Sequence, residues 1–180
     1  MKSLIPLALA AIMFPGLLIA QEKSYDNSPI PSLDLGRFLG VWYEIARFDH
    51  SFERGMDNVA AEYLLRDDGK ILVLNSGWKN GKYKVAEGKA RQADPLTDPA
   101  HLEVSFFLSF YSDYNVLMLD DNYQVALVGS KSPKYLWILS RVPAPKDAVI
   151  DDVLKEAEER GYDTSKLIWV DQDINTAIPF

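Results

Sequence analysis

Between Gly40 and Arg141, short apolar runs alternate with polar turn segments along the chain. Within several runs, apolar and polar residues alternate singly, which is the period of a β-strand with one buried face. The intervening segments carry turn residues, such as Asp68-Gly69 and the hairpin pair Asn80-Gly81. The pattern predicts eight strands, which start at Trp42 and continue with residues 58–65, 71–78, 83–91, 102–107, 115–119, 123–128 and 135–141, with an aromatic segment at 110–114.

The connections between these strands are mostly short. Short connections favour an up-and-down meander, because a Greek key needs at least one long return connection. An open meander would leave two unpaired edge strands that invite aggregation, whereas closure removes both edges. The predicted fold class is therefore all-β, an eight-stranded antiparallel up-and-down β-barrel. A barrel of this size has room for side chains or for one small ligand.

One helix and one further strand follow the barrel region. Pro145 suits the first turn of a helix, and Gly161 suits its C-terminal stop. Between them, apolar residues recur at helical spacing and form one stripe. These residues are Val149, Ile150, Val153, Leu154 and Ala157. The stripe predicts a C-terminal helix packed outside the barrel, and residues 167–170 read as a short ninth strand.

The two ends of the chain differ from its middle. Residues 1–20 resemble a secretory signal, with Lys2 before a long apolar run, so we expect export and cleavage. A transmembrane anchor is the alternative, but the run is short for a span of about 20 residues and contains Pro6 and Pro15. Residues 21–33 are polar and predict a flexible lead-in. The folded domain is expected over residues 34–171, followed by a tail at 172–180.

Composition narrows the possible functions. The 180-residue chain has a formal net charge of −7, which argues against nucleic acid as a partner because phosphate binding needs a basic patch. It contains no cysteine. The sequence therefore offers no disulfide, no thiolate chemistry and no cysteine that would carry a lipid anchor at the signal boundary.

The predicted strands also indicate what lines the barrel. Ala86, Gly88 and Ala90 share one face, opposite charged residues that should point to water. Other strands place larger apolar residues on the inward face, including Tyr63 and Phe106. Small residues on one wall and aromatic residues on another leave room for a guest. The alternative is that large side chains from other strands fill the space.

Three short motifs resemble those of the lipocalin family. Gly40-Val41-Trp42 resembles the G-x-W signature of the first strand, Ser112-Asp113-Tyr114 the second motif, and Ser140-Arg141 the third. The similarity extends over residues 34–171 and is greatest to the bacterial outer-membrane lipocalins, a subgroup that includes apolipoprotein D-like proteins. It implies a calyx open at one end. It also implies that Trp42 packs on Arg141 at the closed end, with Gly40 and Asp113 as further structural signature residues.

The resemblance implies binding or transport of a fatty acid or lysophospholipid, with no cofactor. We expect the acyl chain to be buried in the barrel, where each CH₂ contributes about 0.8 kcal/mol before entropy costs are subtracted. The candidate ligand-binding residues are Glu44, Phe48, Val59, Ala61, Tyr63, Val104, Phe106, Tyr111, Tyr114, Trp137 and Leu139.

The sequence shows no catalytic motif and no metal-ligand spacing. His50 and His101 are the only histidines, and we expect both to be solvated at strand ends or in loops. Glu44 has the strand parity of Trp42 and should face inward. It then serves as a polar anchor for ligand or as half of an internal pair that shapes the wall.

Two other functions remain open at this point. One is a lipid- or isoprenoid-modifying enzyme with Glu44 as its acid or base. The other is an envelope protein whose loop tips around Phe52 and Met56 contact a membrane or a second copy. For the favoured carrier we expect a periplasmic or secreted protein, a monomer or weak homodimer, without a lipid anchor and with peripheral contact to the outer membrane.

Overall fold

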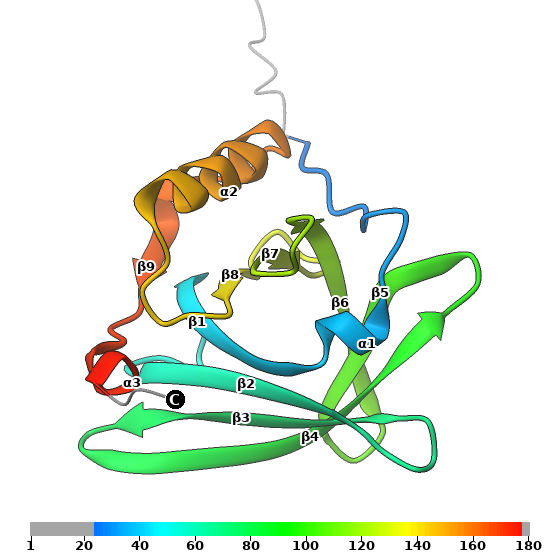
Figure 1. The fold of residues 1–180 in the computed structure, drawn as a ribbon, viewed down its shortest axis with the longest axis horizontal. Helices are drawn as coiled ribbons and strands as arrows, with labels where there is room; N and C mark the ends of the chain where they lie inside the picture. Colours follow the sequence, from blue (N-terminus) through cyan, green and yellow to red (C-terminus); the bar gives the residue numbers. More distant parts are fainter. Residues whose placement is uncertain (1–23, 178–180) are drawn as a thin grey trace, which may run out of the picture.

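The computed structural model describes residues 24–177, so the predicted signal segment 1–20 lies outside the described residues. Figure 1 shows the fold as a barrel with a helix on its outer surface. The strands are β1 Gly40–Phe48, β2 Asp57–Leu65, β3 Ile71–Lys79, β4 Lys82–Asp94, β5 Asp98–Phe107, β6 Phe110–Leu119, β7 Val125–Gly129, β8 Leu136–Ser140 and β9 Leu167–Trp169.

Consecutive strands from β1 to β8 pair antiparallel, and β8 pairs back onto β1. The register sets Tyr43 opposite Ala60 of β2 and opposite Ser140 of β8. The predicted eight-stranded up-and-down barrel is therefore confirmed. The ninth strand is confirmed as well: β9 pairs with the far half of β1, where Phe48 faces Leu167.

Four helical segments accompany the sheet: α1 Leu35–Phe38, α2 Asp147–Glu159, the 3₁₀ turn η1 Thr164–Lys166, and α3 Asp173–Ala177. The helix expected from the apolar stripe is α2, and it lies outside the barrel with Ile150, Val153 and Ala157 buried. The short α1 and α3 were not predicted. Within residues 24–177, none of the helices combines the length and hydropathy that a membrane crossing requires.

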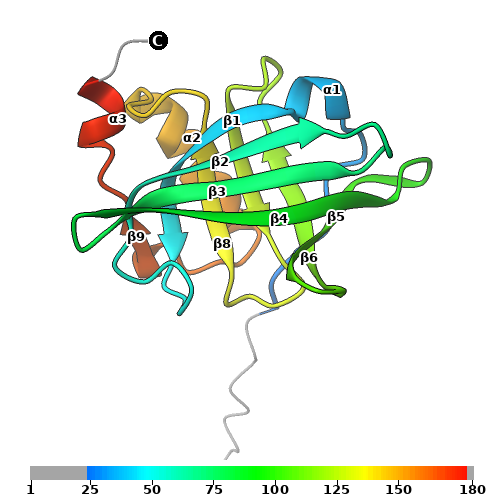
Figure 2. The same ribbon diagram turned by 90° about the horizontal axis from the view of Figure 1, so that it is seen from below.

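The alternating strand directions give the barrel two distinct ends. Connections 49–56, 80–81, 108–109 and 130–135 lie at one end, which we call the open end. Connections 66–70, 95–97 and 120–124 lie at the other end with α1, and we call this the closed end. In Figure 2, connections 49–56 and 130–135 reach the lower edge, whereas α1 lies at the upper edge.

The segment expected to be a flexible lead-in is held against the barrel over its described part, residues 24–33. The Asp26 amide donates to the carbonyl of Arg160 at 2.7 Å, and the Ile30 amide donates to Val116 at 2.8 Å. At the other terminus, the expected tail includes α3. The amide of Ile174 there donates to the side-chain oxygen of Asn58 at 2.8 Å, so this segment is attached to β2.

The buried apolar residues form two clusters separated by the barrel wall. The outer cluster lies between the wall and α2, and the inner cluster lies within the barrel. A register shift in β1 between Glu44 and Ala46 changes which residues face each side. Because of this bulge, Phe48 belongs to the outer cluster, with its ring 6.3 Å from that of Tyr162. Its placement among the cavity residues is therefore wrong.

Candidate functional site

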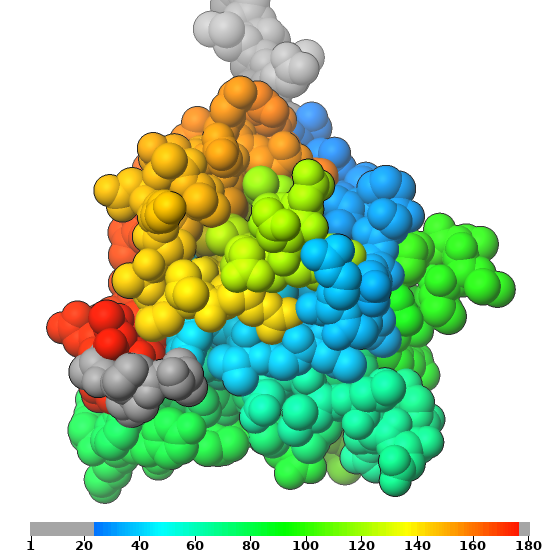
Figure 3. Space-filling view, viewed as in Figure 1, coloured from blue at the N-terminus to red at the C-terminus, as the bar shows by residue number. Residues whose placement is uncertain are grey.

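Trp42 and Arg141 close one end of the barrel. The guanidinium carbon of Arg141 lies 3.9 Å from the centre of the Trp42 ring, the contact that the resemblance implied. Its Nη2 donates to the carbonyl of Leu39 at 2.8 Å and its Nη1 to that of Val41 at 2.7 Å. Gly40 adopts φ +94°, and an added Cβ would lie 3.3 Å from Nη1. Figure 3 views the closed end, where the segment leading into β1 (blue) lies beside the chain around residue 120 (lime).

Above this floor the barrel interior holds the inner cluster of buried apolar side chains, and we call this interior the chamber. Its wall includes Tyr63 and Tyr114, whose hydroxyl groups lie 2.9 Å apart. Burial raises the pKa of both phenols above their ordinary value, so both stay neutral. Six predicted cavity residues belong to the inner cluster or pack on it: Ala61, Tyr63, Val104, Tyr114, Trp137 and Leu139.

Nearer the open end, the chamber becomes polar. Glu44 faces inward opposite Leu139, and its Oε1 accepts a hydrogen bond from Arg47 Nη1 at 2.5 Å. Glu44 and Arg47 are both buried. Burial and the carboxylate of Glu53 raise the pKa of Glu44 to about 8, against the opposing effect of Arg47. Of the two roles expected for Glu44, the structure shows the internal pair.

Arg47 also attaches the β1–β2 connection, residues 49–56, to the wall. Its Nη2 donates to the carbonyls of Glu53 at 3.0 Å and of Met56 at 3.1 Å. The Glu53 side chain points inward, where Oε2 accepts from Trp137 Nε1 at 3.2 Å and lies 2.9 Å from His50 Nε2. Residues 49–56 therefore lie over the barrel with two of their polar side chains buried.

Two glycines in the wall face bulky side chains. A Cβ on Gly77 would lie 2.9 Å from the end of Met56 and 3.0 Å from Val59, and one on Gly88 would lie 2.7 Å from the ring of Phe106. Of the predicted small-residue wall, Gly88 and Ala90 are buried, whereas Ala86 is exposed. Side chains from other segments occupy the space opposite these two glycines, as the alternative interpretation held. A pocket of about 180 Å³ is also lined by Arg66, Glu87, Gly88, Lys89, Ser105, Phe106, Phe107 and Leu108.

Three other expectations are wrong. Tyr111 lies on the outer face, where the guanidinium of Arg91 stacks 4.5 Å from its ring centre. Tyr111 and Tyr114 differ by an odd number of positions, so one strand face cannot hold both. His50 is buried rather than solvated. His101 lies in β5, and its Nε2 is 2.8 Å from Asp113 Oδ1.

Four residues of the polar chamber escaped prediction: Arg47, His50, Glu53 and Met56. One signal for them does exist, because Glu44, Arg47, His50 and Glu53 recur at every third position. That spacing is foreign to a strand, and it marks the place where β1 bulges and then leaves the sheet. Among the residues described, no three or more His, Asp or Glu side chains are grouped so that they could hold a metal ion.

The comparisons with known proteins agree with this geometry. A family described as a lipocalin-like domain matches residues 33–172. The outer membrane lipoprotein Blc of Vibrio cholerae is 44% identical over 169 residues, covering 92% of this chain and 96% of that protein. The chain belongs to the lipocalin family. Apolipoprotein D of Cavia porcellus is also related to this lipocalin, at 32% identity over 81% of each chain.

Solved structures give the same result for the barrel. Insecticyanin from the tobacco hornworm Manduca sexta superimposes with a TM-score of 0.68 at 28% identity, covering 82% of this lipocalin and 85% of that chain. Lipocalins generally bind small hydrophobic molecules rather than catalyse reactions. The chamber of this member joins an apolar floor beside Trp42 to a polar upper part beside Arg47.

Proposed function

We propose that this lipocalin binds a fatty acid or a lysophospholipid in its barrel and acts as an exported carrier, periplasmic or secreted. One observation carries the proposal: the chamber is apolar beside Trp42 and Tyr63 and polar beside Arg47 and His50. An acyl chain packed on the floor would gain roughly 0.8 kcal/mol per buried CH₂. Its head group would then lie near the open end.

The polar part of the chamber offers donors to an anionic head group. Among the described residues, Arg47 Nε and His50 Nδ1 are buried and have no hydrogen-bond partner, whereas His50 Nε2 lies 2.9 Å from Glu53 Oε2. Buried donors of this kind are costly unless something accepts from them. We assign them to the carboxylate of a fatty acid or the phosphate of a lysophospholipid.

The side chains of Met56 and Phe106 would move as the ligand enters. Both pack closely on a glycine of the wall, and both are side chains that can change rotamer without moving the backbone. Methionine is flexible enough to repack against an acyl chain. The lipoprotein relative supports a role at the cell envelope, and we propose that the carrier works as a monomer or weak homodimer.

Titration of the full-length protein with a dansyl-labelled fatty acid tests the proposal. Trp137→Ala should weaken binding by about tenfold or more, since the indole lies in the chamber and donates to Glu53. Trp169→Ala is the matched control, because Trp169 is exposed on β9, and it should change affinity less than about twofold. The absence of saturable binding, or the reverse ranking of the two variants, would refute the proposal.

A further inference from the structure

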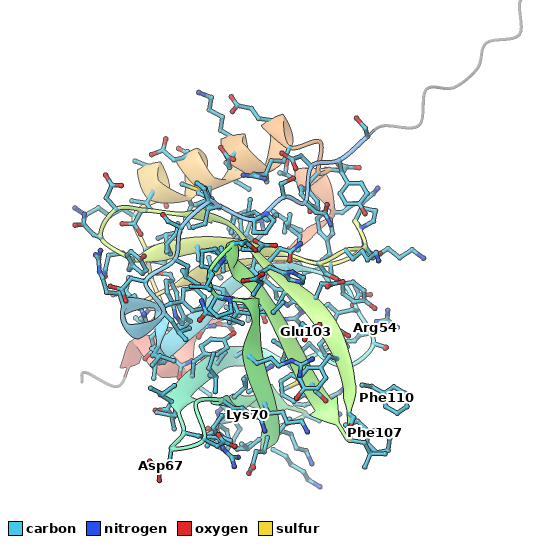
Figure 4. All side chains as sticks on the ribbon, turned by 90° about the vertical axis from the view of Figure 1, so that its right-hand side faces the viewer. Arg54, Asp67, Lys70, Glu103, Phe107 and Phe110 are labelled. Carbon is cyan, nitrogen blue, oxygen red and sulfur yellow. The ribbon has the colours of Figure 1, made fainter. Side chains whose placement is uncertain are left out.

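The open end carries an exposed apolar surface that the ligand chamber does not use. At the tip of the β5–β6 hairpin, Phe107 and Leu108 are each 69% exposed and Phe110 is 74% exposed. The rings of Phe107 and Phe110 stack with their centroids 6.4 Å apart. Figure 4 shows both side chains projecting away from the barrel. We call these three residues the aromatic tip.

A second apolar group lies at the same end. Phe52 of connection 49–56 is 58% exposed, and its ring stacks on His50 and lies 6.4 Å from the ring of Tyr135. Connections 49–56, 108–109 and 130–135 all emerge at this end, because each follows a strand running toward it. Large apolar side chains that project from several loops at one end mark an interaction surface.

Lysines without a carboxylate partner gather around this surface. Within residues 24–177, the lysines without an ion pair are Lys79, Lys82, Lys84, Lys89, Lys131, Lys134 and Lys146. Lys79, Lys82 and Lys84 flank the β3–β4 turn, and Lys131 and Lys134 lie in connection 130–135, so five of these lysines are at the open end. They are free to pair with charges outside the molecule.

The closed end has the opposite charge. Its connections and the strand ends beside them carry Asp67, Asp68, Asp94, Asp98, Asp120 and Asp121, and Asp68 pairs there with Arg66 and Lys70. In Figure 4, Asp67 lies at the lower left and Phe107 and Phe110 lie at the lower right. Arg66, next to Asp67, lines one pocket together with Phe107 and Leu108. In this protein of net charge −7, five of the seven described lysines without an ion pair thus lie at the end that carries the aromatic tip. This polarity aligns the molecule in an electric field from a negatively charged surface.

We propose that the open end docks on the surface of a bilayer that contains anionic lipids. The lysines would pair with lipid phosphates, each contributing about 1 kcal/mol near the membrane surface. The aromatic tip and Phe52 would enter the interfacial region, where aromatic side chains are favoured. Such docking places the chamber entrance against the membrane. The charge complementarity favours a bilayer over a second copy, whose own open end would be equally basic.

Vesicle flotation with the full-length protein tests the docking. Vesicles of phosphatidylethanolamine and phosphatidylglycerol should carry the protein to the top of the gradient, and vesicles of phosphatidylcholine alone should not. Binding should weaken at high salt, since the screening length falls from about 10 Å at 0.1 M to about 3 Å at 1 M. Phe107→Ser with Phe110→Ser, or Lys131→Glu with Lys134→Glu, should each weaken binding by about tenfold.

Matched controls at other sites separate docking from general changes in the surface. Leu65→Ser and Leu96→Ser remove apolar residues that are 60% and 91% exposed at the closed end, and Lys146→Glu reverses an unpaired lysine next to α2. All three should bind vesicles like the unmodified protein. The proposal is overturned if they lose binding equally, if no anionic vesicle binds, or if the phenylalanine variants instead abolish self-association seen by sedimentation without vesicles.

One further variant distinguishes docking from lipid capture in the barrel. Trp137→Ala should lose affinity for the dansyl-labelled fatty acid yet still float with anionic vesicles, because Trp137 lies inside the chamber. If Trp137→Ala stops flotation as well, the vesicles are being bound through the chamber and the docking surface is wrong. If flotation persists but no fatty acid binds to any form, docking stands and the carrier proposal fails.

Discussion

Glu44 is a buried acid in the wall of the chamber, and its proton links stability to pH. Burial raises the pKa of Glu44 to about 8, whereas the ordinary value is 4.5. Between these two values the folded protein keeps a proton that the unfolded chain has lost. Stability therefore falls as the pH rises from about 4.5 to about 8, and it no longer changes through this group above that range.

Glu44→Gln should remove this dependence, because glutamine keeps a hydrogen-bonding side chain of similar shape and does not titrate. We expect urea midpoints of the unmodified protein to fall between about pH 5 and about pH 8, and those of the variant to fall distinctly less. Glu87→Gln is the control, since Glu87 is exposed on β4. A flat profile for the unmodified protein would mean that Glu44 is ionised beside Arg47 in the folded state.

Arg141 holds the closed end through its stacking on Trp42 and its hydrogen bonds to several carbonyls. Arg141→Ala leaves those carbonyls without their donor and uncovers the indole, so it should reduce the free energy of unfolding by about 3 kcal/mol. Denaturant unfolding measures the loss. Arg54→Ala, at an exposed ion pair with Asp49, should reduce the free energy of unfolding far less. Equal losses for the two variants would contradict the structural role of Arg141.

For single residues, the sequence predicts well which face of a regular strand each side chain occupies. It predicts poorly the residues that lie where the backbone is irregular. The inward positions of Trp137 and Leu139 follow from parity along β8. The prediction that Phe48 faces inward fails because one extra residue after Glu44 reverses the face of every later residue in β1. The prediction that His50 is solvated fails because a loop that folds back into the barrel has no periodic pattern in its sequence. The burial of His50 depends on partners such as Glu53 that lie outside any strand.

Among the elements, α2 packs on the outer wall of the barrel, and the turn at its C-terminus binds the lead-in. The turn that ends this helix contains Gly161 at φ +89°, where an added Cβ would lie 2.6 Å from the carbonyl oxygen of Ser24. The positive φ and the close approach both need glycine. The end of α2 and the start of the described chain are therefore built around one residue without a side chain.

Gly161→Ala should destabilise the protein by about 2 kcal/mol and loosen residues 24–28. Limited proteolysis and denaturant unfolding report the two effects. Gly69→Ala is the matched control, since Gly69 has φ +75° but open space around its Cα, so it should cost only about 1 kcal/mol and leave the lead-in intact. If both variants behave alike, the close approach of Ser24 to Gly161 does not contribute to stability.

The short helices α1 and α3 could not be predicted from the sequence pattern. α1 has four residues and α3 has five, too few for an apolar period to emerge. The Gln172 side chain, just before α3, donates to the carbonyls of Glu44 and Val59 and so bridges β1 and β2 where their pairing has ended. An arrangement of this kind depends on three distant segments, and its residues have no signature in the sequence.

For the molecule as a whole, a ligand bound in the chamber should stabilise the folded state against unfolding. At about 100 times its dissociation constant, a fatty acid should raise the free energy of unfolding by about 2.7 kcal/mol. Calorimetry should detect a rise in Tm of roughly 5–10 °C. Hydrogen exchange should slow in residues 49–56, which lie over the chamber. Stabilisation of Trp137→Ala by the same amount would place the ligand elsewhere.

Closure of the barrel also determines when the molecule can finish folding. Arg141 donates to the carbonyl of Val41, a hundred positions earlier, and β1 lacks one neighbour until β8 has been made. Contacts of such long sequence separation form slowly, because the loop between them must first be closed. When the chain emerges from its N-terminus, β1 therefore cannot pair on both sides until nearly the whole chain, including β8, has emerged. For the exported carrier proposed above, this delay would keep the chain unfolded until its translocation is complete.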